Sequence, residues 1–370
     1  MLPHPPLWLI LLAFVCLVGP LVFFHELGHY LVARLFGIPA ETFSIGFGRE
    51  LVGWTDRQGT RWKVAWLPLG GYVKFVGDMS PASNPAELEN VPEHLRDCAF
   101  QTRPVWQRFL VVLAGPAANF LLAMLIFAGV FSLVSAPETN KIGGIQPHSV
   151  AAAAGFKEGD RILSIAGHET RTFDDVRTLI EPRPNQLVRI EFEREGAIQQ
   201  TSVKIGTEKV ADTTGKKLTI GVLGVYAAPV SVVRAVPMAT RLTVRLTVSV
   251  IEGAARLIIG QGSRQDVGGP IKIAQFAGQA ASLGALSFVQ LLALFSINLG
   301  FINLLPVPLT DGGHIFFYAI EAVRRRPVSA DVLEWAFRGG LAVILALMVF
   351  VTVNDLGSVG LWDRLQRLIG

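Results

Sequence analysis

The chain is poor in cysteine and in charged residues, and each shortage excludes a class of protein. It has two cysteines in 370 residues, Cys16 in an apolar run and Cys98 in a polar loop, so no disulfide framework is expected. Charged residues make up only 17% of the chain, and the net charge of +4 comes without a basic stripe interleaved with aromatic residues. Nucleic acid is therefore not an expected partner. Hydrophobic residues make up 51%, which is too many for an ordinary soluble domain.

Long uncharged runs predict helices that cross a membrane. Three of them, Leu7–Phe24, Phe109–Ala136 and Ala285–Leu309, are each long enough to span a bilayer. A shorter run, Gly339–Val353, can also span if its helix starts near Leu333 and Arg338 extends its charged end to the interface. We therefore expect a polytopic α-helical membrane protein with about four transmembrane helices.

The distribution of basic residues predicts the orientation of these helices. No Lys or Arg precedes the first run, and Arg34 is the first of several that follow it. The positive-inside rule then places the N-terminus and residues 137–284 outside, and residues 34–108 in the cytoplasm. Arg364 and Arg367 oppose this assignment, because four spans put them outside too. The first run lacks the positive n-region and cleavage site of a signal peptide.

Composition divides the chain into four regions. Residues 1–136 form an N-terminal membrane domain, 137–228 an extracytoplasmic α/β domain, 229–284 an amphipathic helical segment, and 285–370 a C-terminal membrane domain. In the second region, strand-like runs occur at 161–165, 187–193 and 200–205, and Thr172 with Asp175 forms a capping box. Its segment "IGGIQPHSVAAAAGFKEGDRILSIAG" resembles the start of a PDZ domain, present in one copy. PDZ domains bind extended peptides by adding a strand to a sheet edge.

Two further segments are expected to contact the membrane. Ser231–Gly260 is apolar but carries Arg234, Arg241, Arg245, Glu252 and Arg256, which favours an amphipathic helix lying on the bilayer. The alternative is that this helix packs against the preceding domain. Arg61–Phe75 is predicted to form two short strands around a Pro-Leu-Gly-Gly turn.

The motif His25-Glu26-Leu27-Gly28-His29 directly follows the first apolar run. On a helix, His25 and His29 share one face and can bind the same metal ion, while Glu26 can take a proton from an attacking water. The alternative is a hydrogen-bonded pair of histidines in a helix interface. At membrane depth that alternative is weaker, because ionisable groups there are paired or functional.

A catalytic zinc site usually has three protein ligands, so a third must be found. The first and third spans run in the same direction, which places His25 and Asp311 at the same depth, toward the cytoplasmic face. Asp311 is therefore a candidate ligand. His314, three residues further on, is the rival.

Two motifs together carry a resemblance to a known family. "FFHELGHYLVAR" with "NLLPVPLTDGGH" resembles the paired signature of the site-2 proteases, which are intramembrane zinc metalloproteases, and is most similar to the bacterial regulator-of-sigma-E protease branch. The motifs "FSIGFG", "LPLGGYVKF", "AGPAANF" and "GGPIKIA" match as well, so the likeness covers nearly the whole chain. It implies one Zn²⁺ bound by His25, His29 and Asp311, with Glu26 as the catalytic glutamate. Two departures are Thr310, where the family usually has an apolar residue, and the single PDZ domain.

The resemblance also implies a substrate class and a location. The expected substrates are single-pass transmembrane proteins such as an anti-sigma factor, cut in the bacterial inner membrane after a first cleavage outside. The PDZ domain would then be periplasmic and the active site would lie toward the cytoplasm. An asparagine of the family linked to substrate handling matches Asn303.

A helical substrate must be unwound before it is cut, and its freed backbone then needs new partners. The edge of a membrane-associated β-hairpin at Trp62–Phe75 could supply them, with Gly70, Gly71 and Tyr72 as substrate-binding residues. An ordinary cytoplasmic hairpin is the alternative.

Two other classes of protein compete with the protease. A catalytically inactive membrane adaptor would bind peptides through the PDZ domain alone, but Glu26, both histidines and Asp311 are all present. A transporter with an intramembrane metal site would be expected to show an internal repeat, and none is found.

Overall fold

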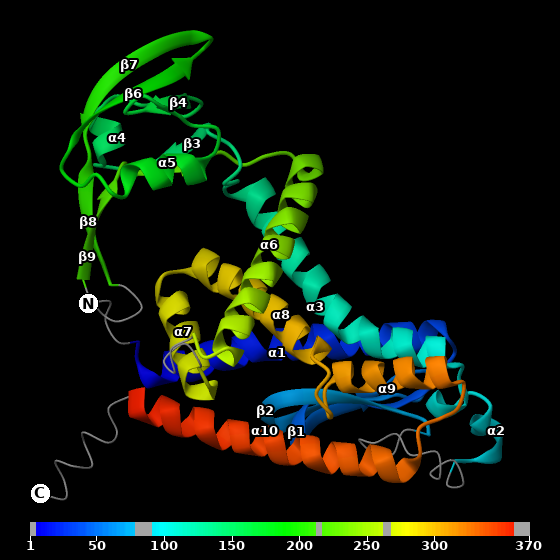
Figure 1. Ribbon diagram of the computed structural model, residues 1–370. Helices are drawn as coiled ribbons and strands as arrows, with labels where there is room; N and C mark the ends of the chain where they lie inside the picture. The colour runs from blue at the N-terminus through cyan, green and yellow to red at the C-terminus, as the bar shows by residue number, and fades with distance from the viewer. Residues whose placement is uncertain (1–4, 78–90, 212–216, 262–267, 359–370) are drawn as a thin grey trace, which may run out of the picture. The chain divides into compact units, whose positions relative to one another are not determined.

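The computed structural model describes residues 5–77, 91–211, 217–261 and 268–358, which form two compact units (Figure 1). The first unit comprises residues 124–242. The second comprises residues 2–123 and 243–370.

Among the described residues, four helices are long and apolar enough to cross a membrane, as expected. Three of them extend past the limits of the apolar runs. The first helix continues beyond Phe24, so His25 and His29 lie within it. The second begins ahead of Phe109, and the fourth begins ahead of Leu333. The four are α1 (Leu7–Leu35), α3 (Val105–Leu133), α8 (Ala285–Leu304) and α10 (Ala330–Ser358).

The second unit contains an antiparallel sheet of β1 (Ala40–Thr55) and β2 (Arg61–Phe75). The predicted pairing of two strands across Pro-Leu-Gly-Gly is wrong. The two halves of β2 pair instead with opposite edges of the same segment of β1, so that Phe43 is opposite both Trp62 and Val73. The tight turn lies between β1 and β2, where Asp56 accepts hydrogen bonds from the backbone N–H groups of Gln58 (2.8 Å) and Thr60 (3.0 Å). A strand has two hydrogen-bonding edges, and local turn residues do not reveal that both are used.

A shared apolar core joins the sheet to α1, α3 and the short helix α9 (Asp311–Arg324). The loop 305–310, which contains Pro306 and Pro308, separates α8 from α9. An ion pair of 2.7 Å between Arg108 of α3 and Glu321 of α9 adds a polar link between those helices. The buried residues of this core are Tyr30, Ala33, Ile38, Ala40, Phe43, Phe75, Phe100, Val111, Val112 and Tyr318.

The helix α7 (Pro270–Ser282) contacts α1, α8 and α10. Its N-terminus is capped by a residue of another helix. The buried carboxylate of Asp355 on α10 accepts hydrogen bonds from the backbone N–H groups of Gly269 (3.0 Å) and Lys272 (3.1 Å). The first N–H groups of a helix have no partner within the helix, so this carboxylate satisfies two of them and holds α7 to α10.

The first unit contains the predicted α/β domain. Its four-stranded sheet has the order β5-β4-β6-β7, and two two-stranded sheets pair β10 with β3 and β8 with β9. The capping box of Thr172 and Asp175 is confirmed at the start of α5. The strand at 161–165 is confirmed, that at 187–193 extends by one residue, and the third runs from 197 to 204. The elements are β3 (Ile142–Ile145), α4 (Val150–Ala153), β4 (Arg161–Ile165), β5 (His168–Glu169), α5 (Phe173–Ile180), β6 (Leu187–Arg194), β7 (Ala197–Lys204), β8 (Gly206–Ala211), β9 (Lys217–Val222) and β10 (Val225–Ala227).

The amphipathic segment is a helix, α6 (Val232–Ile258). Its place on the membrane stays a prediction. Between β2 and α3 the structure also has two short helices, α2 (Glu93–Arg96) and η2 (Phe100–Thr102).

Candidate metal centre

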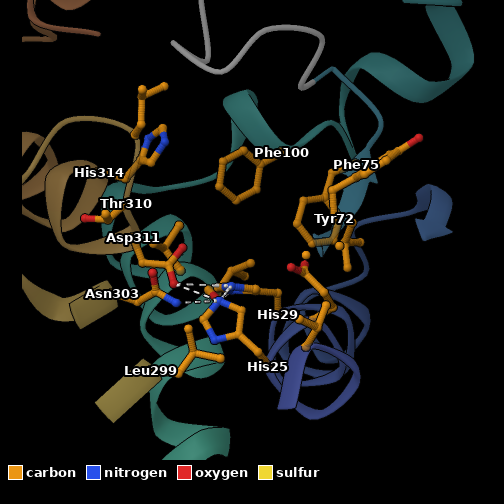
Figure 2. Close-up of a pocket in the computed structure, with 18 of the residues that line it drawn as sticks. His25, His29, Tyr72, Phe75, Phe100, Leu299, Asn303, Thr310, Asp311 and His314 are labelled. Carbon is orange, nitrogen blue, oxygen red and sulfur yellow. Dashed lines mark hydrogen bonds and ion pairs between the residues drawn. The ribbon is translucent and has the colours of Figure 1, made fainter. Parts of the chain in front are cut away.

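Helix α1 presents two histidines on one face. His25 and His29 are one turn apart, and each is 8% exposed. Their Nε2 atoms point toward each other at 3.2 Å. Asp311, the first residue of α9, faces the same point, and Figure 2 shows the three side chains converging.

The three candidate ligand atoms form a triangle of suitable size for zinc. The Oδ2 atom of Asp311 lies 3.1 Å from His25 Nε2 and 3.5 Å from His29 Nε2, which with the 3.2 Å between the two nitrogens completes the triangle. Tetrahedral zinc with bonds of 2.0–2.1 Å requires ligand atoms about 3.3–3.4 Å apart. Two imidazoles and one carboxylate with this spacing therefore fit a zinc ion with one position left open.

A hydrogen bond to the second ring nitrogen of His29 determines which tautomer this ring adopts. His29 Nδ1 lies 2.8 Å from the backbone oxygen of Val111 on α3. A carbonyl oxygen only accepts hydrogen bonds, so Nδ1 carries the hydrogen and Nε2 of the neutral ring is left with its lone pair.

The ligand triangle opens into a cavity of about 430 Å³. Glu26, next to His25 in sequence, lies on the wall of this cavity and accepts a backbone hydrogen bond from Val73 of β2. The side-chain amide of Asn303 lies 3.4 Å from His25 Nε2, on the same side as Asp311 (Figure 2). The structure therefore places the predicted base and the predicted asparagine beside the candidate ligands.

The other residues predicted to bind substrate also line the cavity. Gly70, Gly71 and Tyr72 belong to the half of β2 that passes Glu26. The loop before α9 contributes Leu309 and Thr310 to the wall. All of the predicted site residues thus border one cavity.

Two glycines allow α1 and α3 to approach closely at this site. A Cβ atom built on Gly28 would lie 2.3 Å from the backbone oxygen of Ala114, and one on Gly115 would lie 2.2 Å from His29 Nε2. Contacts this short are not possible, so only glycine fits at either position. The glycines of the motifs "HELGH" and "AGPAANF" thus hold the two histidines against α3.

His314, the rival ligand, does not belong to the cluster of candidate ligands. Its ring instead packs near the rings of Tyr318 (6.3 Å between centroids) and Phe337 (5.0 Å). The structure favours Asp311 as the third ligand.

Sequence reasoning missed the part that α3 plays in the site. Val111, Gly115 and Asn119 all lie against the histidines. The motif "AGPAANF", which contains Gly115 and Asn119, was the available signal.

Two imidazoles, a carboxylate and a neighbouring glutamate, on or beside helices able to span a membrane, define a site of the metallohydrolase type. Residues 13–347 match the family model described as Peptidase family M50. The chain therefore belongs to that family, the site-2 proteases.

Three similar proteins have been named as metalloproteases. The chain is 43% identical to a protein of Rhizobium meliloti and 41% identical to one of Agrobacterium fabrum, both named "Putative zinc metalloprotease". In each case the match covers 93% of this chain and 95% of the relative. It is 37% identical to "Metalloprotease MmpA" of Caulobacter vibrioides, over 94% of this chain and 95% of that protein.

Among solved structures, the PDZ domain of an SdrC-like protein from Listeria monocytogenes matches with a TM-score of 0.20 and 16% identity. The match covers 25% of this chain and 90% of that one. A TM-score this low does not establish a shared fold, so the PDZ assignment of residues 137–228 stays a prediction.

Proposed function

We propose that this protein is an intramembrane zinc metalloprotease that cleaves the transmembrane segments of membrane-anchored regulators. One observation carries the proposal: the ligand atoms of His25, His29 and Asp311 are spaced for a tetrahedral zinc ion, and Glu26 borders the same cavity. Membership of peptidase family M50 supports the reaction class.

The residues around the triangle have separate tasks in peptide hydrolysis. Zinc, when bound, supplies a Lewis acid that polarises the scissile carbonyl and makes water a better nucleophile. Glu26 takes the proton from the attacking water and returns it to the leaving amine. Asn303, whose side-chain Nδ2 lies 3.4 Å from His25 Nε2, donates a hydrogen bond to the substrate.

The half of β2 at the cavity suits an unwound substrate. Residues 71–74 pair with β1 along one edge, and Gly71, Tyr72 and Val73 of this stretch line the cavity. A substrate strand added there would regain hydrogen bonds that it loses on unwinding. Gly70, Gly71 and Tyr72 would then contact the substrate.

The proposal also assigns the protein a location and an orientation. The protein lies in the bacterial inner membrane with its active site toward the cytoplasm, and residues 137–228 form a periplasmic PDZ domain. A cavity of about 560 Å³ beside α5 and β10 offers that domain a peptide groove. Substrates such as an anti-sigma factor arrive after a first cleavage outside, and the domain either binds their new C-terminus or excludes untrimmed chains.

The test compares zinc content and cleavage in three proteins: wild type, Glu26→Gln and Asp311→Ala. Each is purified in detergent and given a model single-pass membrane protein. We expect wild type to hold one zinc and to cut within the membrane segment, Glu26→Gln to hold zinc without cutting, and Asp311→Ala to lose both. Cleavage by Glu26→Gln at the wild-type rate would show that the assignment of the base is wrong. Zinc-loaded wild type that cuts no membrane substrate would favour the inactive adaptor.

A further inference from the structure

Asn119 of α3 is a fully buried polar residue in the membrane part of the protein. In the structure, its side-chain Nδ2 lies 3.1 Å from His25 Nδ1, on the side of the ring away from the ligand triangle, so the orientation with the oxygen toward the ring requires the amide to be rotated. Its backbone oxygen accepts a hydrogen bond of 2.7 Å from the hydroxyl of Ser296 on α8. Asn119 therefore connects α1, α3 and α8 behind the candidate metal centre.

The orientation of this amide decides which nitrogen of His25 can bind a metal. With the NH₂ group toward Nδ1, the ring nitrogen must accept, so Nε2 of a neutral ring carries the hydrogen and cannot be a ligand. With the oxygen toward Nδ1, the ring donates from Nδ1 and presents the Nε2 lone pair to the triangle. A rotation of the amide by about 180° exchanges the positions of its oxygen and nitrogen, so the two atoms have to be assigned from the hydrogen bonds that they make.

Hydrogen-bond counting alone does not choose between the orientations. With the NH₂ group toward His25, the Oδ1 atom of Asn119 finds no hydrogen-bond partner among the described residues. After rotation, the NH₂ group occupies that place instead. The deciding requirement is that Nε2 of His25 carry no hydrogen, so that its lone pair can bind the metal. His29 already meets this requirement, because its Nδ1 donates to the backbone oxygen of Val111.

We propose that Asn119 is a positioning residue for zinc: its side-chain oxygen accepts the Nδ1 hydrogen of His25 and holds that ring in the tautomer that binds the metal through Nε2. The inference deepens the proposed function and rests on it. Loss of such a partner behind a metal ligand typically weakens metal binding by 10–100-fold.

The test measures zinc affinity directly, without cleavage. Full-length protein in detergent is stripped of metal and titrated with Zn²⁺ in a chelator-buffered series. Asn119→Leu keeps a similar volume but has no acceptor, Asn119→Asp has an acceptor in either orientation, and Ser296→Ala removes the neighbouring hydroxyl while leaving the amide in place.

We expect Asn119→Leu to bind zinc 10–100-fold more weakly than wild type, and Asn119→Asp and Ser296→Ala to remain within about threefold. Wild-type affinity in Asn119→Leu overturns the proposal, as does an equal loss in the leucine and aspartate variants. If the leucine variant does not fold, Asn119→Asp carries the test, and tenfold weaker binding in that variant overturns the proposal. Failure of the wild-type protein to bind zinc would instead defeat the proposed function, so the two failures are distinguishable.

Discussion

A Cβ atom at Gly115 of α3 would lie 2.2 Å from Nε2 of His29 on α1. The candidate metal centre is thus formed against the bare backbone of a neighbouring helix. The two histidines cannot retreat from that helix while Val111 and Asn119 hold their second ring nitrogens.

The first prediction follows from this contact. Gly115→Ala should displace the His29 ring and weaken zinc binding at least tenfold, with a matching loss of proteolysis. Gly129→Ala is the matched control in the same helix, because a Cβ there meets no atom within 4 Å. It should bind zinc normally and be slightly more stable, since glycine within a helix costs about 0.5–1 kcal/mol relative to alanine. Equal zinc affinity in both variants, measured by titration, would contradict the steric explanation.

A second prediction separates the substrate edge from the metal. A Cβ on Gly71 would lie 2.6 Å from both Ser44 O and Val22 Cγ1. Gly71→Ala should therefore push β2 away from α1, slowing cleavage at least tenfold while zinc content stays at the wild-type level. Gly144→Ala in β3 is a control strand glycine, because its added Cβ would make only an ordinary contact of 3.6 Å with Tyr226. Loss of zinc from Gly71→Ala would show that this glycine supports the metal centre and not the substrate edge alone.

A third prediction concerns the stability of the first unit (residues 124–242) at acid pH. Burial alone would raise the pKa of Asp160, but hydrogen bonds from Arg194 (2.7 and 2.8 Å) and the Lys157 backbone outweigh it, and the pKa lies below its usual value of 3.8. Because the folded-state pKa is the lower one, this stabilisation is complete above about pH 5. It is lost as the pH falls through the folded-state value.

Asp160→Asn should therefore destabilise the unit by about 3 kcal/mol at neutral pH and remove this part of its acid sensitivity. Hydrogen exchange of β4 and β6 in the full-length protein, corrected for intrinsic rates, measures both effects. Glu169→Gln serves as the control, because its ion pair with Arg171 is exposed and should leave exchange unchanged. An unchanged acid profile in Asp160→Asn would assign the acid sensitivity to other groups.

The fourth prediction concerns the cap on α7. Asp355→Ala removes the acceptor of two backbone N–H groups and should cost about 1–3 kcal/mol. Thermal unfolding in detergent should show a lower midpoint, whereas zinc bound per folded molecule should not change. A loss of zinc at temperatures where the variant is folded would connect α7 to the metal centre.

The sequence predicted the candidate ligands because their geometry is local or set by the membrane. His25 and His29 share a helix face at any tilt, and Asp311 follows a span that was expected to run in the same direction as the first. The capping box at Thr172 was predictable for the same reason, since both partners lie within one turn.

The features that sequence reasoning missed all depend on distant partners. Val111 is 82 residues from His29, Asn119 is 94 residues from His25, and Asp355 is 86 residues from Gly269. The pairing of Phe43 with both halves of β2 is likewise a choice between edges that local turn residues do not show. Asparagine in a helix also has many uses, so its identity alone does not say which group it bonds.

The separation of the ligands along the chain has a consequence during synthesis. His25 is 278 residues ahead of Asn303, and Asp311 is made later still. At 5–20 residues per second, the ribosome adds that stretch in on the order of 15–55 s. During this interval the HExxH helix is already made, while the carboxylate that completes the site does not yet exist. If the chain is the proposed protease, it cannot hydrolyse peptides until Asp311 has been made, and a product terminated before Asp311 would be inert.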